Sequence, residues 1–477
     1  MRVVAALVAG VLLLAGCTSS DDEPDGSPSP APSAQATTSS ESPGLSNPVE
    51  DGVYPEVGDP GVDALEYALD IAWDPDTRTM TGRETVRLRA TDDADHLQLD
   101  LAADLEIGSV SVDGSDAAYE HRGKDLVISH AARADQVYRL VIEYDGTPTP
   151  VPAPSQRRDM DTIGWETTAD GEVWTMQQPY GAYSWYAVND QPSDKALYSF
   201  TITAPAPLVG VANGELVSRS TTAGETTTRW ELDEPAASYL VTIAIADLVE
   251  TKERSASGVP IAYWTPRGRP ELVAKLREAP AGLDWLEERL GPYPFGSLGF
   301  LIVDSTSGME TQTMITLGDS AYATSPEVLV HEMAHQWWGD QVTPVDWRDM
   351  WMNEGMAMFI QGAWQAQSDG TTIESVMDEW AETEPRLRSD HGPPADYDPE
   401  AFGAGNVYYG PALMWDELRK RLGDDEFWRL VRAWPAAHDN GNADYADITT
   451  WWSEQTGEDL SGFFDDWLLG ETTPQRS

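Results

Sequence analysis

Two histidines and a distant glutamate have the residue types and the spacing of a catalytic metal site. The segment His331–His335 reads HEMAH, so its two imidazoles are four residues apart and share one face of a helix. Two imidazoles placed in this way can bind one Zn²⁺. Eighteen residues separate His335 from Glu354, which we predict to be the third ligand. Two histidines and one glutamate leave a fourth position open for water, as in catalytic zinc sites.

Glu332 follows the first histidine and is the expected general base. It lies close enough to the ligands to take a proton from a water molecule without being a ligand itself. The alternative is a buried pair of helices in which His331, His335 and Glu354 only hydrogen-bond to one another. Because five constrained positions are in register, the spacing favours the metal site.

The helix that must carry the two histidines has a clear start and a clear end. The segment Ser325–Glu327 combines a typical N-cap, a proline for the first helical position and an acid for the first turn. We therefore expect a helix that runs to about Trp338 and ends at Gly339. A second helix beginning near Met350 would bring Glu354 back to the same point.

The N-terminal part of the body, residues 54–255, has the pattern of a β domain. Polar and apolar residues alternate in short segments such as 84–89, 137–144 and 238–245. A period of two is typical of half-buried strands, and the pattern predicts an antiparallel sheet. A binding or adhesion module would have the same pattern, so this part alone does not indicate a reaction.

From residue 256 to 473 the pattern becomes mainly helical. Leucines recur at helical spacing over residues 271–290, with Pro280 marking a break. The segment 299–304 reads GFLIVD and predicts a short buried strand. The fold class that we expect is multidomain α+β, with the metal site in the helical domain.

The metal motif and the residues before it resemble those of the gluzincins, and within them the aminopeptidase N family. That family is marked by HExxH-x18-E and by an upstream Gly-x-Met-Glu-Asn strand, which Gly308-Met309-Glu310 resembles here. The resemblance implies that Glu310 binds the free α-ammonium group of a peptide substrate, with Gly308 and Met309 in the same substrate-binding strand. A carboxylate at a fixed distance from the metal would select chains that end in a cation.

Further segments extend the resemblance to residues 55–473. Residues 175–178 and 190–195 resemble the N-terminal signature of the family, and residues 463–467 (FFDDW) resemble the end of its catalytic domain. Tyr408, in the segment YYGPA, aligns with the family's tyrosine that stabilises the tetrahedral oxyanion, and Tyr409 is the competing assignment. Gln178, in the segment TMQQ, resembles the family's second contact to the substrate amine. The resemblance thus implies a saddle-like β domain, a thermolysin-like catalytic domain, one Zn²⁺ and peptides with a free N-terminus. We expect no C-terminal helical-repeat domain of the kind that many members of the family have.

Three positions depart from the family's pattern. Thr311 and Asp340 stand where the family usually has Asn, and Gln361 stands where an acid often orients a ligand histidine. Changes of this kind behind the ligands lower metal affinity or activity by about 10- to 100-fold. Two alternatives to an aminopeptidase therefore stay open: a peptide-binding lipoprotein with little or no catalysis, and an endopeptidase.

The N-terminus resembles a bacterial lipoprotein signal. Arg2 precedes an apolar run that is short for a membrane span, and residues 14–17 read LAGC, a lipobox in which Cys17 would be lipidated. We predict a signal peptide over 1–17 and a disordered Ser/Pro/Asp-rich stalk over 18–53. The expected location is extracytoplasmic, with the protein anchored to the cell membrane. The alternative is an ordinary cleaved signal peptide.

The charge of the chain excludes one class of partner. Acidic residues outnumber basic ones 81 to 30, which gives a formal net charge of −51. Such a surface repels phosphate backbones and anionic lipid head groups, so we expect no nucleic-acid partner and membrane contact only through the lipid anchor. The same charge could attract a peptide's ammonium group, or it could serve solubility alone. The sequence indicates no particular oligomeric state.

Overall fold

The structure is a computed structural model that describes residues 43–477. The predicted signal peptide over 1–17, the lipobox cysteine Cys17 and most of the predicted stalk lie outside these residues. Within the described part of the chain, no helix is both long enough and apolar enough to cross a bilayer.

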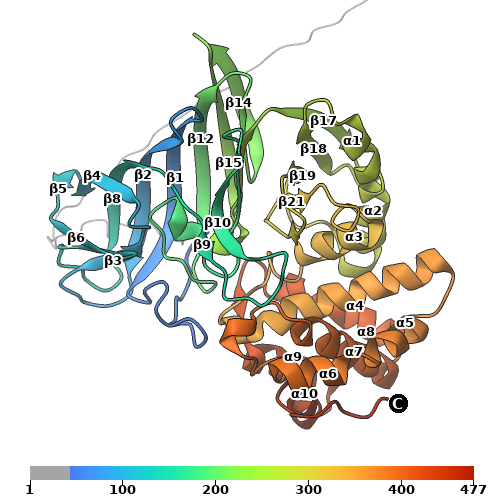
Figure 1. The fold of residues 1–477 in the computed structure, drawn as a ribbon. Helices are drawn as coiled ribbons and strands as arrows, with labels where there is room; N and C mark the ends of the chain where they lie inside the picture. The colour runs from blue at the N-terminus through green and yellow to red at the C-terminus, as the bar shows by residue number, and fades with distance from the viewer. Residues whose placement is uncertain (1–42) are drawn as a thin grey trace, which may run out of the picture. The chain divides into compact units, whose positions relative to one another are not determined.

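A long eight-stranded sheet forms one side of the β-rich part (Figure 1, blue to green). Its strand order is β14-β15-β12-β1-β2-β8-β4-β5. Neighbouring strands are antiparallel, as predicted, except that β1 pairs in parallel with β12. The strands are β1 (Val62–Asp74), β2 (Thr79–Ala90), β4 (Leu105–Val112), β5 (Ser115–Asp116), β8 (Val137–Gly146), β12 (Lys195–Pro205), β14 (Glu215–Thr222) and β15 (Glu225–Ala237).

Two smaller sheets complete the β-rich part. In the first, the order is β13-β16-β11-β10-β9, and in the second it is β3-β7-β6. Buried and exposed side chains alternate along most of the long strands, as the period of two in the sequence predicts. The bounds of the strands are β3 (Leu97–Asp100), β6 (Tyr119–Arg122), β7 (Asp125–Ile128), β9 (Val151–Pro152), β10 (Thr162–Thr167), β11 (Val173–Met176), β13 (Val209–Ala212) and β16 (Ile243–Ala246).

The second half of the chain begins with a sheet of its own, in the order β17-β18-β19-β21-β20. Its strands are β17 (Leu248–Arg254), β18 (Pro260–Pro266), β19 (Leu298–Val303), β20 (Gly308–Met309) and β21 (Met314–Gly318). Strand β17 lies before the boundary that we predict at residue 255, but it pairs along its whole length with β18. Alternation of polar and apolar residues marks a strand without indicating which sheet it joins, so the sequence placed β17 with the wrong neighbours.

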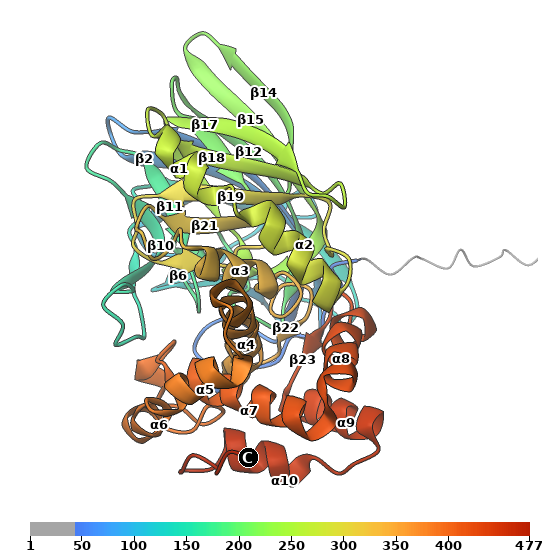
Figure 2. The ribbon, with the colours of Figure 1, turned by 90° about the vertical axis from the view of Figure 1, so that its right-hand side faces the viewer.

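Helices cover this second sheet and then form most of the rest of the chain (Figures 1 and 2), together with a short two-stranded sheet of β22 (Thr343–Pro344) and β23 (Asn442–Ala443). Figure 2 shows α1 and α2 lying across one face of the sheet, with the predicted break between them. The helices are α1 (Pro270–Leu276), α2 (Ala279–Leu290), α3 (Pro326–His335), α4 (Met350–Asp369), α5 (Ile373–Ala381), α6 (Glu384–His391), α7 (Asn406–Leu422), α8 (Asp424–Ala437), α9 (Tyr445–Thr456) and α10 (Ser461–Leu468).

The two helices of the metal motif form as predicted, with one difference. Ser325 caps α3 by accepting a hydrogen bond from the backbone of Val328, and α4 begins at Met350. Helix α3 ends at His335, three residues before the predicted end at Trp338. The chain turns there because the His335 carbonyl accepts from the backbone N–H of Asp340, which draws the following loop back onto the helix end.

The last residues of the predicted stalk are part of the folded body. Ser46 is buried and donates its backbone N–H to Asp63 on β1, and its hydroxyl accepts from the backbone N–H of Lys195. Asp51 is also buried and accepts the backbone N–H of Trp347. The prediction that residues 43–53 belong to a disordered stalk is therefore wrong. These polar residues are ordered by hydrogen bonds to the body, which composition alone does not reveal.

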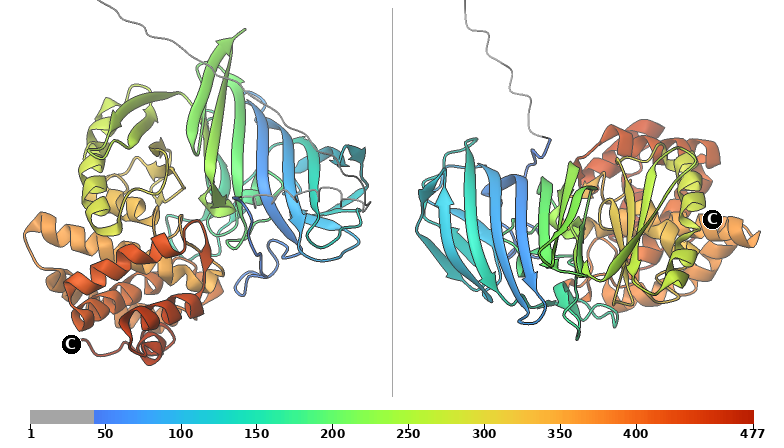
Figure 3. Two further views of the ribbon diagram at one scale, coloured as in Figure 1. Left: turned by 180° about the vertical axis from the view of Figure 1, so that it is seen from behind. Right: turned by 90° about the horizontal axis from the view of Figure 1, so that it is seen from above.

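The view from above in Figure 3 shows the strands of the large sheet following one another toward the second sheet and its helices. Buried hydrophobic side chains form two clusters. One fills the β-rich part and continues into the second sheet and the helices, for example at Met309 and Val407, and the other lies between the second sheet and the helices. The metal motif lies on α3 and α4, which pack against each other beneath the second sheet. The rigid surroundings of these two helices fix the positions of the site residues.

Candidate metal centre

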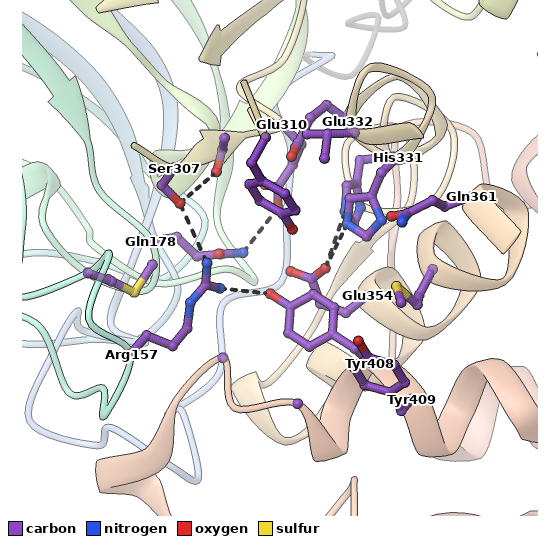
Figure 4. A pocket seen from close by; sticks show the side chains of 18 of the residues that line it. Arg157, Gln178, Ser307, Glu310, His331, Glu332, Glu354, Gln361, Tyr408 and Tyr409 are labelled. Atoms are coloured by element: carbon purple, nitrogen blue, oxygen red, sulfur yellow. Dashed lines mark hydrogen bonds and ion pairs between the residues drawn. The ribbon is translucent and has the colours of Figure 1, made fainter. Parts of the chain in front are cut away.

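The structure brings His331, His335 and Glu354 to one point, between α3 and α4 (Figure 4). The Nε2 atoms of the two histidines are 3.1 Å apart. The Oε2 atom of Glu354 is 3.3 Å from the Nε2 of His331 and 3.4 Å from that of His335. Ligands about 2.0–2.1 Å from a tetrahedral Zn²⁺ are themselves about 3.3 Å apart. These three atoms therefore have the spacing of one face of a zinc coordination tetrahedron.

The hydrogen bonds behind the ligands differ between the two histidines. The Nδ1 of His335 lies 3.1 Å from the carbonyl oxygen of Trp338, so an N–H at this position leaves Nε2 with a free lone pair for a metal. The buried Nδ1 of His331 has no hydrogen-bond partner among residues 43–477. His335 is therefore the better oriented of the two ligands.

The charges at this point also favour a bound cation. Burial alone would raise the pKa of Glu354, but the two imidazoles outweigh it and hold this pKa well below its ordinary value. Burial would lower the pKa of His335, but Glu310 and Glu354 raise it to about 10. Burial and then Glu310 raise the pKa of Glu332 to about 8. The carboxylates that stabilise a proton on His335 would also stabilise a divalent cation bound in place of that proton.

A second group of potential ligands, formed by Glu310, Glu332 and His335, overlaps the first. The two groups share His335, so one ion cannot take both sets as they stand. The first group has two nitrogen donors and one oxygen donor, which suits Zn²⁺. We therefore assign the metal to His331, His335 and Glu354 and leave Glu310 and Glu332 beside it.

Two residues that the sequence predicts as substrate contacts meet although they are 132 positions apart. The Nε2 of Gln178, which follows β11, donates to the Oε1 of Glu310 at 3.1 Å. Glu310 comes directly after β20, and both side chains line the cavity above the metal ligands. Gly308 leaves room for Glu332, because a Cβ at this position would lie 2.6 Å from the Oε1 of Glu332 and would displace its carboxylate. Met309 points away, since its side chain is buried in the hydrophobic core.

The two candidate tyrosines at the start of α7 have different surroundings. The Tyr408 ring stacks beside the His331 ring with their centroids 6.2 Å apart, and its hydroxyl lies among the site residues (Figure 4). The Tyr409 ring packs edge-on against Trp380 with their centroids 5.6 Å apart. Of the two, Tyr408 is thus the one whose hydroxyl can reach a group held over the metal ligands.

Two of the three departures from the family's pattern, Thr311 and Asp340, make buried hydrogen bonds of their own. The Thr311 hydroxyl is buried and bonds to the hydroxyl of Thr316 at 2.9 Å. The Oδ2 of Asp340 accepts from the Nε2 of Gln336 at 2.6 Å, and the same nitrogen donates to the carbonyl of Glu310. Gln361 lines the cavity, but no hydrogen bond joins it to His331. Of the three, only the departure at Gln361 bears on a ligand, because the Nδ1 of His331 has no hydrogen-bond partner in the described part of the chain.

The cavity over the ligands has a volume of about 400 Å³ and is lined from both halves of the molecule. The β-rich part contributes Arg157, Met160 and Gln178, and Arg157 had no signal in the sequence because its loop belongs to no motif. The other lining residues are Ser307, Gly308, Glu310, Tyr322, Val328, His331, Glu332, His335, Glu354, Met358, Gln361, Gln365, Trp380, Gly403, Gly405, Tyr408 and Tyr409.

Comparison with known families accounts for most of the described chain. The profile of the peptidase M1 N-terminal domain matches residues 63–240, and the profile of the peptidase family M1 domain matches residues 275–467. The two profiles follow each other in the order of the β-rich and the helical parts. The chain belongs to peptidase family M1. Both histidines and Glu354 lie within the second matched segment.

Relatives within the M1 family are distant in sequence. An aminopeptidase N of Streptomyces lividans is 26% identical over 445 residues, which is 85% of this chain and 50% of that protein. An aminopeptidase 2 of Candida albicans is 25% identical over 450 residues and is matched over 47% of its length. The chain thus spans about half the length of these relatives.

Solved structures of M1 proteins share the fold over nearly the whole body. An M1 zinc metallopeptidase from Deinococcus radiodurans, a mutant bound to a Tyr-Ser-Ala substrate, superposes with a TM-score of 0.79 at 23% identity. The match covers 90% of this chain and 99% of that chain. A two-domain M1 zinc metallopeptidase mutant bound to L-arginine gives 0.81 at 24% identity, with the same coverage. The expected fold class, a β domain followed by a helical catalytic domain, is confirmed.

Proposed function

We propose that the chain is a zinc-dependent aminopeptidase, which hydrolyses the N-terminal peptide bond of peptides with a free N-terminus. One observation carries the proposal: the Glu310–Gln178 pair lies next to the three candidate ligands in a single cavity. A carboxylate beside a metal centre can bind an α-ammonium group and so place the first peptide bond over the metal. The aminopeptidases and zinc metallopeptidases among the relatives support it.

The roles of the residues follow from their positions. His331, His335 and Glu354 would hold one Zn²⁺, which when bound supplies a Lewis acid for the scissile carbonyl. Glu332 holds the proton that leaves the attacking water and returns it to the leaving amine. The Tyr408 hydroxyl donates to the oxygen that becomes negatively charged. Glu310 and Gln178 accept hydrogen bonds from the substrate amine, and Gly308 leaves room for Glu332.

The test is hydrolysis of an aminoacyl anilide by the purified chain. We expect turnover that a chelator abolishes and added Zn²⁺ restores, together with release of single residues from the N-termini of peptides. Internal cleavage of N-acetylated peptides would establish an endopeptidase instead. Peptide binding without hydrolysis at any zinc concentration would establish the catalytically inactive alternative.

Glu310→Gln separates recognition of the amine from the reaction itself. The amide has the same shape but lacks the charge that attracts an ammonium group, so we expect KM to rise by about 10- to 100-fold, in line with the loss of a charge-assisted hydrogen bond. The zinc content of the variant should equal that of the wild type. Equal KM values for the variant and the wild type would assign the amine to another group.

We also propose that the protein is a lipoprotein anchored on the extracytoplasmic side of the cell membrane. The proposal is supported by the apolar run after Arg2 and by the lipobox ending at Cys17. Replacing Cys17 by Ala in the full-length chain should move the protein from the membrane fraction to the soluble fraction. Equal partitioning of the two forms would favour an ordinary cleaved signal peptide.

A further inference from the structure

Arg157 is the only arginine or lysine among the described residues that line the cavity, and the roles assigned so far do not include it. It lies in the loop between β9 and β10, in the β-rich part, and extends to Tyr408 on α7 (Figure 4). Its Nη1 donates to the Tyr408 hydroxyl oxygen at 3.1 Å. Among residues 43–477, no other group hydrogen-bonds to this hydroxyl. The contact therefore joins the β-rich part directly to a residue of the proposed reaction site.

The guanidinium group is held in place from its other side. Its Nε donates to the Oδ1 of Asp159 at 3.2 Å, and its Nη2 donates to the Oδ2 at 2.6 Å. The Ser307 hydroxyl also donates to the Oδ2 of Asp159, at 3.1 Å. A two-point pairing of this kind fixes the plane of an arginine and compensates its charge. Asp159 thus takes Nε and Nη2, and Nη1 is directed at Tyr408. Because Asp159 already compensates the positive charge, this arrangement argues against Arg157 binding an anionic group of the substrate.

We propose that Arg157 is a positioning residue that orients the Tyr408 hydroxyl for the reaction. Because the guanidinium donates to the hydroxyl oxygen, the hydrogen of that hydroxyl is free to point at another acceptor. The Tyr408 ring stacks beside His331, so this hydrogen can be directed at the oxygen of a substrate carbonyl over the metal ligands. A cationic donor on the hydroxyl oxygen also polarises the O–H bond, so the hydroxyl becomes a stronger hydrogen-bond donor to the substrate. The inference rests on the proposed function.

No covalent step is assigned to Arg157. It keeps all of its protons, and it acts by holding Tyr408 in the orientation that matches the developing oxyanion. The M1 site described here is then incomplete without the β-rich part, because that part supplies both Gln178 for the substrate amine and Arg157 for the oxyanion side.

The experiment compares Arg157→Gln with Arg158→Gln, using the full chain loaded with zinc. Arg158 is the neighbouring arginine and its side chain is exposed, so its replacement is the matched control. We expect Arg157→Gln to lower kcat by about 10- to 100-fold, the range seen when a partner behind a reacting group is lost. KM should change by less than about threefold, because ground-state binding is left intact. Zinc content should be unchanged, and Arg157→Lys should restore part of kcat.

A double-mutant cycle with Tyr408→Phe decides whether Arg157 acts through Tyr408. In the Tyr408→Phe background, Arg157→Gln should cause almost no further decrease in kcat. Asp159→Asn weakens the contact that holds the guanidinium group but leaves Arg157 in place. It should give a smaller decrease in kcat, and this decrease should also disappear in the Tyr408→Phe background. This second variant keeps the cycle informative if Arg157→Gln does not fold.

Three outcomes would overturn the inference while leaving the proposed function intact. The first is wild-type kcat for Arg157→Gln. The second is an undiminished loss in the Tyr408→Phe background, which would show a role independent of that hydroxyl. The third is a rise in KM confined to substrates with a free C-terminal carboxylate, which would make Arg157 an anion-binding residue. A wild-type chain that hydrolyses no peptide would remove the proposed function and the inference together.

Discussion

At the scale of single residues, Glu332 can be changed without disturbing the packing around it. Its carboxylate lies close to Gly308, so an isosteric amide fits where a larger side chain would not. Glu332→Gln cannot accept a proton, and we expect kcat to fall by about 10²- to 10⁴-fold, the usual contribution of a general base. Metal analysis should find the same zinc content as in the wild type, because Glu332 is not one of the three ligands.

The control for this variant is Glu327→Gln, which changes an acid in the first turn of the same helix outside the cavity. It should keep wild-type kcat. Turnover by Glu332→Gln at the wild-type rate would assign the base to another group of the cavity, and loss of zinc from this variant would make Glu332 a ligand.

Another buried acid, Glu84 on β2, should make stability depend on pH. Burial raises its pKa to about 8, although one oxygen accepts from the backbone N–H of Ala187 and from the Tyr144 hydroxyl. Its other oxygen has no partner among the described residues. The folded chain thus holds a proton that the unfolded chain releases near its ordinary pKa of 4.5. The contribution of Glu84 to the free energy of unfolding is therefore largest below pH 4.5 and decreases as pH rises toward 8.

Glu84→Gln keeps the shape and removes the titration. Between pH 5 and 8 we expect its free energy of unfolding to vary less steeply than that of the wild type, by up to about 1.4 kcal/mol for each pH unit. Denaturant unfolding at several pH values measures this slope. Glu106→Gln, at an exposed position of β4, is the control and should follow the wild type. Parallel curves for Glu84→Gln and the wild type would mean that Glu84 is ionised in the folded chain.

At the scale of elements, the approach of α4 to α7 brings Glu354 near Tyr408. The helices touch at Gly355, where an added Cβ would lie 2.2 Å from the Cβ of Pro411. Alanine usually stabilises a helix relative to glycine, but here it would push the two helices apart. We expect Gly355→Ala to lower the free energy of unfolding by about 1–3 kcal/mol, the usual cost of overpacking. It should also lower kcat, because Tyr408 moves with α7.

Gly462 on α10 provides the matched control, because nothing lies within 4 Å of an added Cβ there. Gly462→Ala should keep the free energy of unfolding of the wild type or raise it slightly, by less than the roughly 0.5–1 kcal/mol expected in the middle of a helix, because Gly462 lies in the first turn of α10. Thermal unfolding and anilide hydrolysis measured on both variants test the argument. If Gly355→Ala were as stable as the wild type, α4 and α7 would not be in close contact at this point.

The elements also show what the sequence could and could not predict. Spacing predicted α3 and α4 because the ligands, the N-cap and the helix starts are local features of the chain. It could not find Arg157, since a loop arginine becomes part of the site only when the β-rich part folds against α7. The end of the stalk was missed for the same reason, because Ser46 and Asp51 are ordered by partners far away in the sequence.

At the scale of the whole molecule, the two halves are joined close to the metal helices. Lys195 at the start of β12 is buried, and its Nζ donates to the carbonyls of Asp340 and Gln341 in the loop after α3. Burial lowers its pKa to about 7. Lys195 is the last residue of the segment 190–195, which resembles the N-terminal signature of the family, and its two hydrogen bonds join this segment to the loop after α3. The β-rich part fixes the loop that follows the two histidines.

Asp51 joins the halves at a second point and offers the clearest test of their coupling. Its carboxylate accepts the backbone N–H groups of Val53 and Tyr54 on one side and of Trp347 on the other. Trp347 lies in the short turn that leads into α4, three residues before that helix begins. Asp51→Ala leaves these donors without their acceptor, and we expect a loss of about 2–4 kcal/mol in the free energy of unfolding.

The turn at Trp347 leads into the helix that carries Glu354. Replacing Asp51 should therefore also change the position of Glu354 at the metal centre. Asp51→Ala should bind Zn²⁺ more weakly than the wild type in a competition titration with a chelator, although Asp51 is not a ligand. Glu50→Ala changes the neighbouring, exposed acid and should leave both stability and zinc affinity unchanged. A variant that loses stability at Asp51 but binds zinc as the wild type does would show that the β-rich part supports the fold of the M1 site without setting the position of α4.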